Sequence, residues 1–299
     1  MRIGIFSGDG TVADLVETAR RVEADGFDSF WLPQIFGTDA LSAHTLIGHL
    51  VPRIELGTAV VPTYPRHPGV LAGQALTASA ASGGRLTLGI GLSHKLVIEN
   101  MFGYSYDKPV RHLREYLSAL LPMLAGEGSD VDGETLSSHL APAVPGAVTP
   151  VPVVIAALGP KMLRLAAERA AGTVTWMTGP RTLADHTVPT ITREADAAGT
   201  GPMRVVAALP VAVTADETGT RERAGRMFEV YGMLPSYRAM LDREGVAGPA
   251  DVAFVGSEAQ VAASIESMRD AGVTDFVAVP FQAPGAEADA TWSVLRSFR

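Results

Sequence analysis

The sequence contains no cysteine. Disulfides, thiol nucleophiles, iron–sulfur clusters and zinc–thiolate sites are therefore excluded, and redox chemistry would require a borrowed cofactor. No run of 18 apolar residues is present, so we expect no membrane-spanning helix and no membrane partner. The amino-terminal apolar run ends at residues 7–10 and lacks the features of a signal peptide, which favours a cytoplasmic protein.

Positive charge is also scarce. The chain has 24 Lys plus Arg residues against 32 Asp plus Glu residues, which gives a formal net charge of −8. Binding to a nucleic acid backbone requires a concentrated basic surface, so nucleic acid is not an expected partner. Hydrophobic residues make up 47% of the 299 residues, which is enough to build a large core and excludes a disordered chain.

Short apolar runs alternate with helical patterns along the whole chain. Thr11 and Asp14 form an N-cap pair before the first helical pattern, and Gly26 stands where a left-handed residue usually closes a helix. Ser257 and Gln260 form a capping box before the helical pattern that precedes the eighth strand. The runs mostly lack strict polar–apolar alternation, which is typical of a parallel sheet buried on both faces. Eight such units close most simply into a (β/α)8 TIM barrel, an α/β fold, and an open doubly wound sheet is the alternative. The eight expected strands are residues 3–6, 29–32, 56–61, 86–90, 153–157, 174–177, 205–213 and 276–279.

No linker long enough to separate two domains interrupts this pattern. We therefore expect a single domain over residues 1–299, with two insertions. The first, near residues 126–152, is rich in proline. The second, near residues 231–256, lies between the seventh and eighth units, and we expect it to add short helices over the barrel mouth.

Several familiar catalytic motifs are missing. The segment Gly89-Ile90-Gly91 is not a dinucleotide fingerprint, because His94 occupies the position of the third glycine. The same segment lacks the closing glycine of a nucleophile elbow, and no P-loop is present. His44 and His49 are five residues apart and so face different sides of a helix, which means that no metal site is predicted.

The active site of a TIM barrel lies at the carboxyl ends of its strands. Here these ends carry few titratable groups, chiefly His94 and Arg181, which argues against paired catalytic carboxylates or a lysine Schiff base. A mouth rich in small and apolar residues suits a flat ring such as a flavin, which brings its own chemistry. The segment Gly159-Pro160-Lys161 opens a helix whose free N–H groups would hold a phosphate. A plain strand-to-helix turn would have the same sequence.

At these positions the chain resembles the luciferase-like monooxygenase superfamily, and within it the branch of actinobacterial type that uses the deazaflavin coenzyme F420. The resemblance covers nearly the whole chain, and the order of the matching segments is more specific than any one of them. The segments are Ile54-Glu55-Leu56-Gly57-Thr58-Ala59-Val60-Val61 with Arg66-His67-Pro68, then Gly84-Arg85-Leu86-Thr87-Leu88-Gly89-Ile90-Gly91, Arg111-His112-Leu113-Arg114-Glu115-Tyr116-Leu117, and Val153-Val154-Ile155-Ala156-Ala157-Leu158-Gly159-Pro160.

The resemblance implies a luciferase-like TIM barrel that holds the deazaflavin ring at the carboxyl ends of its strands, usually in a homodimer. It also implies a cis peptide bond without proline after the third strand, which here would join Ala59 to Val60. We expect Ser7, Gln34, Gly91 and Ser93, which follow or end other strands, to border the ring as well. The residues expected around the cofactor phosphate are Ala157, Leu158, Gly159, Lys161 and Met162.

Deazaflavin-dependent relatives often have an acidic residue and a histidine just after the second strand, where this chain has Gln34 and Ile35. This departure leaves His94 as the predicted catalytic acid or base, because only histidine titrates near neutrality without perturbation. Arg181 and Trp176 are predicted to face the substrate.

The resemblance thus implies an oxidoreductase that moves a hydride between coenzyme F420 and a small organic substrate, with His94 or a group of the substrate handling the proton. Two alternatives stay open, namely an FMN-dependent monooxygenase and a barrel that binds a flavin without turnover. A lyase that works without a cofactor is disfavoured because the strand ends carry so few charges.

Overall fold

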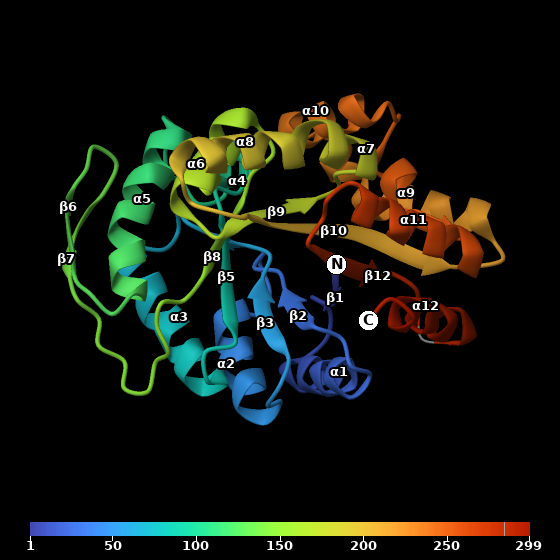
Figure 1. The fold of residues 1–299 in the computed structure, drawn as a ribbon, viewed down its shortest axis with the longest axis horizontal. Helices are drawn as coiled ribbons and strands as arrows, with labels where there is room; N and C mark the ends of the chain where they lie inside the picture. Colours follow the sequence, from blue (N-terminus) through green and yellow to red (C-terminus); the bar gives the residue numbers. More distant parts are fainter. Residues whose placement is uncertain (284) are drawn as a thin grey trace.

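The computed structural model describes residues 1–283 and 285–299 and is built around a closed ring of eight parallel strands (Figure 1). Strand β12 pairs with β1 on one side and with β10 on the other, and β10 also pairs with β9, which closes the ring. This confirms the predicted (β/α)8 barrel over an open sheet. The ring consists of β1 (Arg2–Phe6), β2 (Ser29–Leu32), β3 (Glu55–Thr58), β5 (Leu86–Gly91), β8 (Val153–Ala156), β9 (Gly172–Trp176), β10 (Arg204–Val213) and β12 (Asp275–Pro280).

Helices surround the ring and cover its outer face (Figure 1). The predicted caps form: Thr11 and Asp14 make a reciprocal capping box, as do Ser257 and Gln260, and Gly26 adopts a φ of 78°, in the region that favours glycine. The main helices are α1 (Val12–Ala24), α2 (Ala40–Leu50), α3 (Pro68–Ser82), α5 (Pro109–Leu124), α6 (Pro160–Arg169), α8 (Val188–Ala198), α9 (Glu217–Met233), α11 (Glu258–Asp270) and α12 (Ala286–Arg296).

The third strand is interrupted, although the sequence predicts one continuous run over residues 56–61. It consists of β3 and the short β4 (Val61–Pro62), and the predicted cis peptide bond between Ala59 and Val60 lies between the two. The Thr58 hydroxyl donates to the Gly89 carbonyl oxygen at 2.8 Å and accepts from the Gly89 N–H at 2.8 Å. A side chain therefore replaces the backbone ladder between β3 and β5 at this point.

The two segments predicted as insertions contain regular structure. Residues 126–152 include an antiparallel hairpin of β6 (Ser129–Asp132) and β7 (Ser137–Leu140). Residues 231–256 contain the end of α9, the helix α10 (Pro235–Glu244), the 3-10 turn η2 (Pro249–Val252) and β11 (Phe254–Gly256), which pairs with β10 outside the ring. The sequence does not predict two short helices that follow strands, namely α4 (Lys95–Asn100) and α7 (Pro180–Thr182). The helix expected near residues 183–198 begins with the π-helical turn η1 (Leu183–Thr187) and continues as α8.

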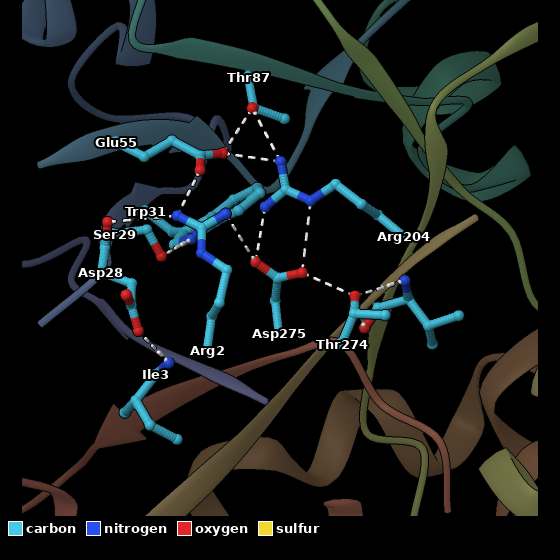
Figure 2. Close-up of polar contacts among 11 residues, drawn as sticks. Arg2, Ile3, Asp28, Ser29, Trp31, Glu55, Thr87, Arg204, Thr274 and Asp275 are labelled. Atoms are coloured by element: carbon cyan, nitrogen blue, oxygen red, sulfur yellow. Dashed lines mark hydrogen bonds and ion pairs between the residues drawn. The ribbon is translucent and has the colours of Figure 1, made fainter. Parts of the chain in front are cut away.

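Charged side chains fill the amino-terminal end of the barrel (Figure 2). Arg204 bonds to Glu55 at 2.8 Å and to Asp275 at 2.6 Å, and Arg2 pairs with the same two carboxylates at 2.6 and 3.2 Å. Hydrogen bonds and ion pairs with these acids raise the pKa of Arg204 even though burial, the largest single influence, acts to lower it. This ion-paired layer therefore closes the end of the barrel opposite the predicted site.

Candidate active site

The carboxyl-terminal mouth of the barrel has an apolar floor. Its side chains come from the ends of five different segments of the ring, are partly buried, and pack on a small interior cluster that includes Trp31 and Val154. A surface of this kind accommodates the face of a planar ring better than it accommodates a charged substrate. The side chains of this apolar floor are Phe6, Ala59, Val60, Ala156, Trp176 and Val279.

Gly91, predicted to border the cofactor ring, lies within this floor. A Cβ atom at this position would lie 2.7 Å from Cγ2 of Val60 and 3.1 Å from Cβ of Ala156. The lack of a side chain therefore lets the end of β5 fit between these two floor residues. Ser7 is also placed at the mouth, where its N–H donates to the Trp31 carbonyl oxygen at 3.1 Å.

Aromatic side chains form a wall beside the floor. The Trp176 ring is stacked on Phe6 with centroids 6.3 Å apart, and it makes edge contacts with Phe228 and Tyr231 at 5.7 and 5.8 Å. Tyr231 in turn contacts Tyr237 at 5.1 Å. The predicted site residue Trp176 thus lies where floor and wall meet.

Three members of this aromatic wall, Phe228, Tyr231 and Tyr237, were missed by the sequence analysis. They lie on the helices α9 and α10 and not at the ends of strands, where a barrel fold directs attention. The only available signal was the expectation that the second insertion adds helices over the mouth. That expectation does not identify which side chains a helix directs toward the site.

His94 stands at the edge of this wall, with its ring centroid 5.6 Å from that of Tyr237. It precedes α4 and makes no side-chain cap bond to that helix. The preceding residue, Ser93, has a φ of 57°, which is unusual for a residue other than glycine and occurs frequently at functional sites. Burial lowers the pKa of His94 below its usual 6.5, so the imidazole is neutral at neutral pH and able to accept a proton.

The start of α6 has the features expected of a phosphate-binding helix terminus. Gly159 is the N-cap residue, no side chain caps the helix, and a Cβ added to Gly159 would meet nothing within 4 Å. Lys161 is exposed, and within residues 1–283 and 285–299 no carboxylate lies within ion-pair distance of its amine. Nearby, Ala157 is buried, Leu158 and Met162 are partly buried, and the Leu158 carbonyl oxygen contacts Nε2 of His186 at 2.9 Å. The open backbone and the free cation fit an anionic group.

Two residues that were predicted to lie in the site, Gln34 and Arg181, make their contacts elsewhere. The Gln34 Oε1 atom accepts from the Ala40 N–H at 2.8 Å and so serves the start of α2. Arg181 is exposed and pairs with Asp185 at 3.7 Å. In the described part of the chain, neither side chain has a hydrogen bond or ion pair with the apolar floor or the aromatic wall.

Among the described residues, no group of three or more His, Asp or Glu side chains is arranged to hold a metal ion. No helix among them has both the length and the apolar character needed to cross a bilayer.

A separate groove of about 640 Å³ opens beside the mouth, between the start of α3, α5 and the hairpin. The Tyr64 ring stacks on His112 at 4.0 Å within it. Its cations are paired, Arg66 with Asp39 and Lys108 with Glu134. The groove is therefore aromatic and charge-balanced, which gives it no preference for an anion.

Comparison with known proteins places the chain in a family. Residues 1–275 match the family model described as luciferase-like monooxygenase. A 5,10-methylenetetrahydromethanopterin reductase from Methanolobus tindarius is 29% identical over 259 residues, which cover 86% of this chain and 78% of the relative.

Two solved structures share the fold. A coenzyme F420 dependent tetrahydromethanopterin reductase from Methanopyrus kandleri has a TM-score of 0.81 and 21% identity, over 98% of this chain and 97% of the other. An F420-dependent secondary alcohol dehydrogenase in complex with an F420–acetone adduct has a TM-score of 0.80 and 19% identity, over 99% and 96%. These two structures confirm the barrel expected from the sequence. The family model confirms the expected family, and the chain belongs to the luciferase-like monooxygenase family.

Proposed function

We propose that this chain is an oxidoreductase that transfers a hydride between coenzyme F420 and a small organic substrate. The observation that carries the proposal is the combination of an apolar floor with an uncapped helix start bearing a free lysine. The names of its relatives and fold neighbours, which are reductases and a dehydrogenase, support the same reaction class. The family also contains monooxygenases by name, so FMN is the alternative cofactor.

The residues at the mouth fit a tricyclic cofactor with a phosphate. The apolar floor, in particular Ala59, Val60 and Trp176, would contact the ring, and the N–H groups at the start of α6 with Lys161 would hold the phosphate. When bound, a deazaflavin supplies a two-electron hydride acceptor or donor. The aromatic wall would exclude water from the reacting face, which protects a hydride from loss to solvent.

His94 would handle the proton that accompanies the hydride. In the direction of oxidation, the substrate carbinol carbon loses a hydride and its hydroxyl loses a proton to the neutral His94, so an alcohol becomes a ketone. Burial raises the pKa of Tyr237, which keeps its hydroxyl protonated beside the imidazole. Because burial lowers the pKa of His94, its imidazole is better suited as a base than as an acid at neutral pH.

Cofactor choice is tested by titrating the purified protein with oxidised F420 and with FMN. We expect saturable and clearly tighter binding of F420. Lys161→Ala should weaken F420 binding about tenfold or more, since a charge-assisted phosphate contact contributes about 1.5–3 kcal/mol. Lys108→Ala, which removes a lysine already paired with Glu134, is the matched control and should leave the affinity unchanged. Equal or tighter FMN binding would favour the monooxygenase instead.

The role of His94 is tested by His94→Ala in the F420-loaded enzyme. We expect turnover to fall by about 10²–10⁴-fold with unchanged F420 affinity, which is the range for loss of a general base. The wild-type rate of alcohol oxidation should fall as the pH drops below 6.5, because protonation at the lowered pKa removes the base. This acidic limb should be missing in His94→Ala.

The matched control is His49→Ala, which removes an exposed histidine of α2 and should change neither rate nor pH profile. Unchanged kinetics in His94→Ala would remove this residue from the mechanism. Turnover of no carbonyl, imine or alcohol by a protein that still binds F420 would favour the barrel that binds without catalysis.

A further inference from the structure

Large apolar side chains are exposed on two loops beside the mouth. One loop follows β2, and the other segment comprises α4 and the turn after it, which follow β5. Their exposed fractions lie between 38% and 61%. Such a cluster on a folded chain marks a binding surface more often than a chance exposure. We call this group the apolar rim, and its members are Ile35, Phe36, Leu96, Met101 and Phe102.

The two loops touch each other, so the apolar rim is continuous. The rings of Phe36 and Phe102 lie 6.4 Å apart between centroids, within the range of aromatic contact. Each loop is held at both ends. Gln34 and Asp39 bond to the first N–H groups of α2, and Tyr106 donates to the Ser93 carbonyl oxygen at 3.4 Å. The apolar rim is therefore a defined surface of the fold.

The strand order places the apolar rim directly against the apolar floor. In the ring, β2 and β5 are the two neighbours of β3, whose end leads into Ala59 and Val60. The loops after β2 and β5 therefore flank this part of the floor on both sides. A molecule whose reacting carbon lies over Ala59 and Val60 would extend across the apolar rim.

The two segments that carry the apolar rim, residues 33–38 and 95–102, hold no unpaired charge. Residues 33–38 include no ionisable side chain, and on the other loop Lys95 pairs with Glu99 at 3.7 Å. Arg66 pairs with Asp39, the residue that follows the first loop and caps α2. A charged substrate would lose hydration here without gaining a partner, whereas a neutral apolar one loses nothing.

We infer that the substrate is a neutral, predominantly apolar molecule with a ring or chain that extends from the apolar floor onto the apolar rim. This inference rests on the proposed function. It specifies which alcohols or ketones the enzyme takes, namely those with a bulky apolar substituent. Small polar or phosphorylated substrates are disfavoured by the same surface.

The first test uses Nile red, a neutral polycyclic dye, titrated by fluorescence into protein saturated with F420. We expect saturable binding by the wild type and an affinity about tenfold lower or worse in Phe36→Ser, Phe102→Ser and Leu96→Ser. The matched control is Leu46→Ser, which removes an exposed leucine of α2 that is not part of the apolar rim, and should bind the dye as the wild type does. The molecular mass in solution is measured for every variant.

The second test measures kcat/KM for straight-chain secondary alcohols of increasing length. We expect kcat/KM to rise with chain length in the wild type and in Leu46→Ser, and to rise less steeply in the three variants of the apolar rim. Equal dye affinity in all proteins would overturn the inference. The inference would also be overturned if the three variants change the molecular mass in solution but not the dye affinity, because a second copy of the chain would then cover the apolar rim. Failure of the wild type to bind F420 would overturn the proposed function itself, whereas normal F420 binding with a flat length series would overturn only this inference.

Discussion

Replacing Arg204 by leucine is expected to lower the free energy of unfolding by about 3–5 kcal/mol, the range for breaking a buried ion pair by removing one partner. Arg204 lies between Glu55 and Asp275 at the amino-terminal end of the barrel (Figure 2). The Asp275 side chain is only 2% exposed. Without Arg204 its carboxylate would keep only Arg2, at 3.2 Å, as a cationic partner. Chemical denaturation followed by circular dichroism measures the effect.

The control is Arg164→Leu. Arg164 also pairs with a glutamate, Glu194, at 2.8 Å, but its side chain is 60% exposed. Exposed pairs contribute about 1 kcal/mol or less, so this variant should unfold almost as the wild type does. If both arginine variants lose the same small amount of stability, the ion-paired layer does not hold the ring closed.

The second large effect is expected from Gly57→Ala, which should destabilise the protein by about 3 kcal/mol or more. A Cβ atom at Gly57 would overlap the six-membered ring of Trp31, which fills the barrel interior and is fully buried. Overpacking of a close-packed interior forces side chains off their rotamers or shifts the backbone. The indole has little freedom to move, because its Nε1 donates to the Ser29 hydroxyl at 2.8 Å.

A double-mutant cycle separates this clash from a general cost of alanine. Trp31→Leu makes room, so the pair Gly57→Ala with Trp31→Leu should be more stable than the sum of the single effects implies. Gly73→Ala on α3 is the matched control, since a Cβ there meets nothing within 4 Å and alanine favours helix by up to about 1 kcal/mol. Additive effects in the cycle would show that Trp31 is not the obstacle.

The parallel barrel could be predicted because its signals are local. Apolar runs, caps such as Thr11 with Asp14, and the glycine at position 26 each depend on residues close in sequence, and the ring of eight strands and these caps formed as expected. The break in the third strand could not be predicted from periodicity, because it depends on a hydroxyl of Thr58 reaching a neighbouring strand. The cis bond after it was expected only from the family resemblance.

The candidate site was predicted less completely, because it depends on long-range packing. Residues at strand ends, including Ala59, Val60 and Trp176, do meet in one floor, since parallel strands end at one side of a barrel. The contact between His94 and Tyr237 joins positions 143 residues apart by their numbers, and no local pattern encodes it. The roles of the predicted residues in binding and catalysis stay predictions until the variants are measured.

The charged layer and the substrate loops lie at opposite ends of the barrel, and this arrangement affects how the sequence can evolve. Arginines and carboxylates that secure ring closure lie at one end, and the loops that would select a substrate lie at the other. Substitutions after β2 and β5 can thus alter what is recognised while the anchoring layer stays intact. New substrate specificities can therefore evolve on this fold without destabilising the barrel.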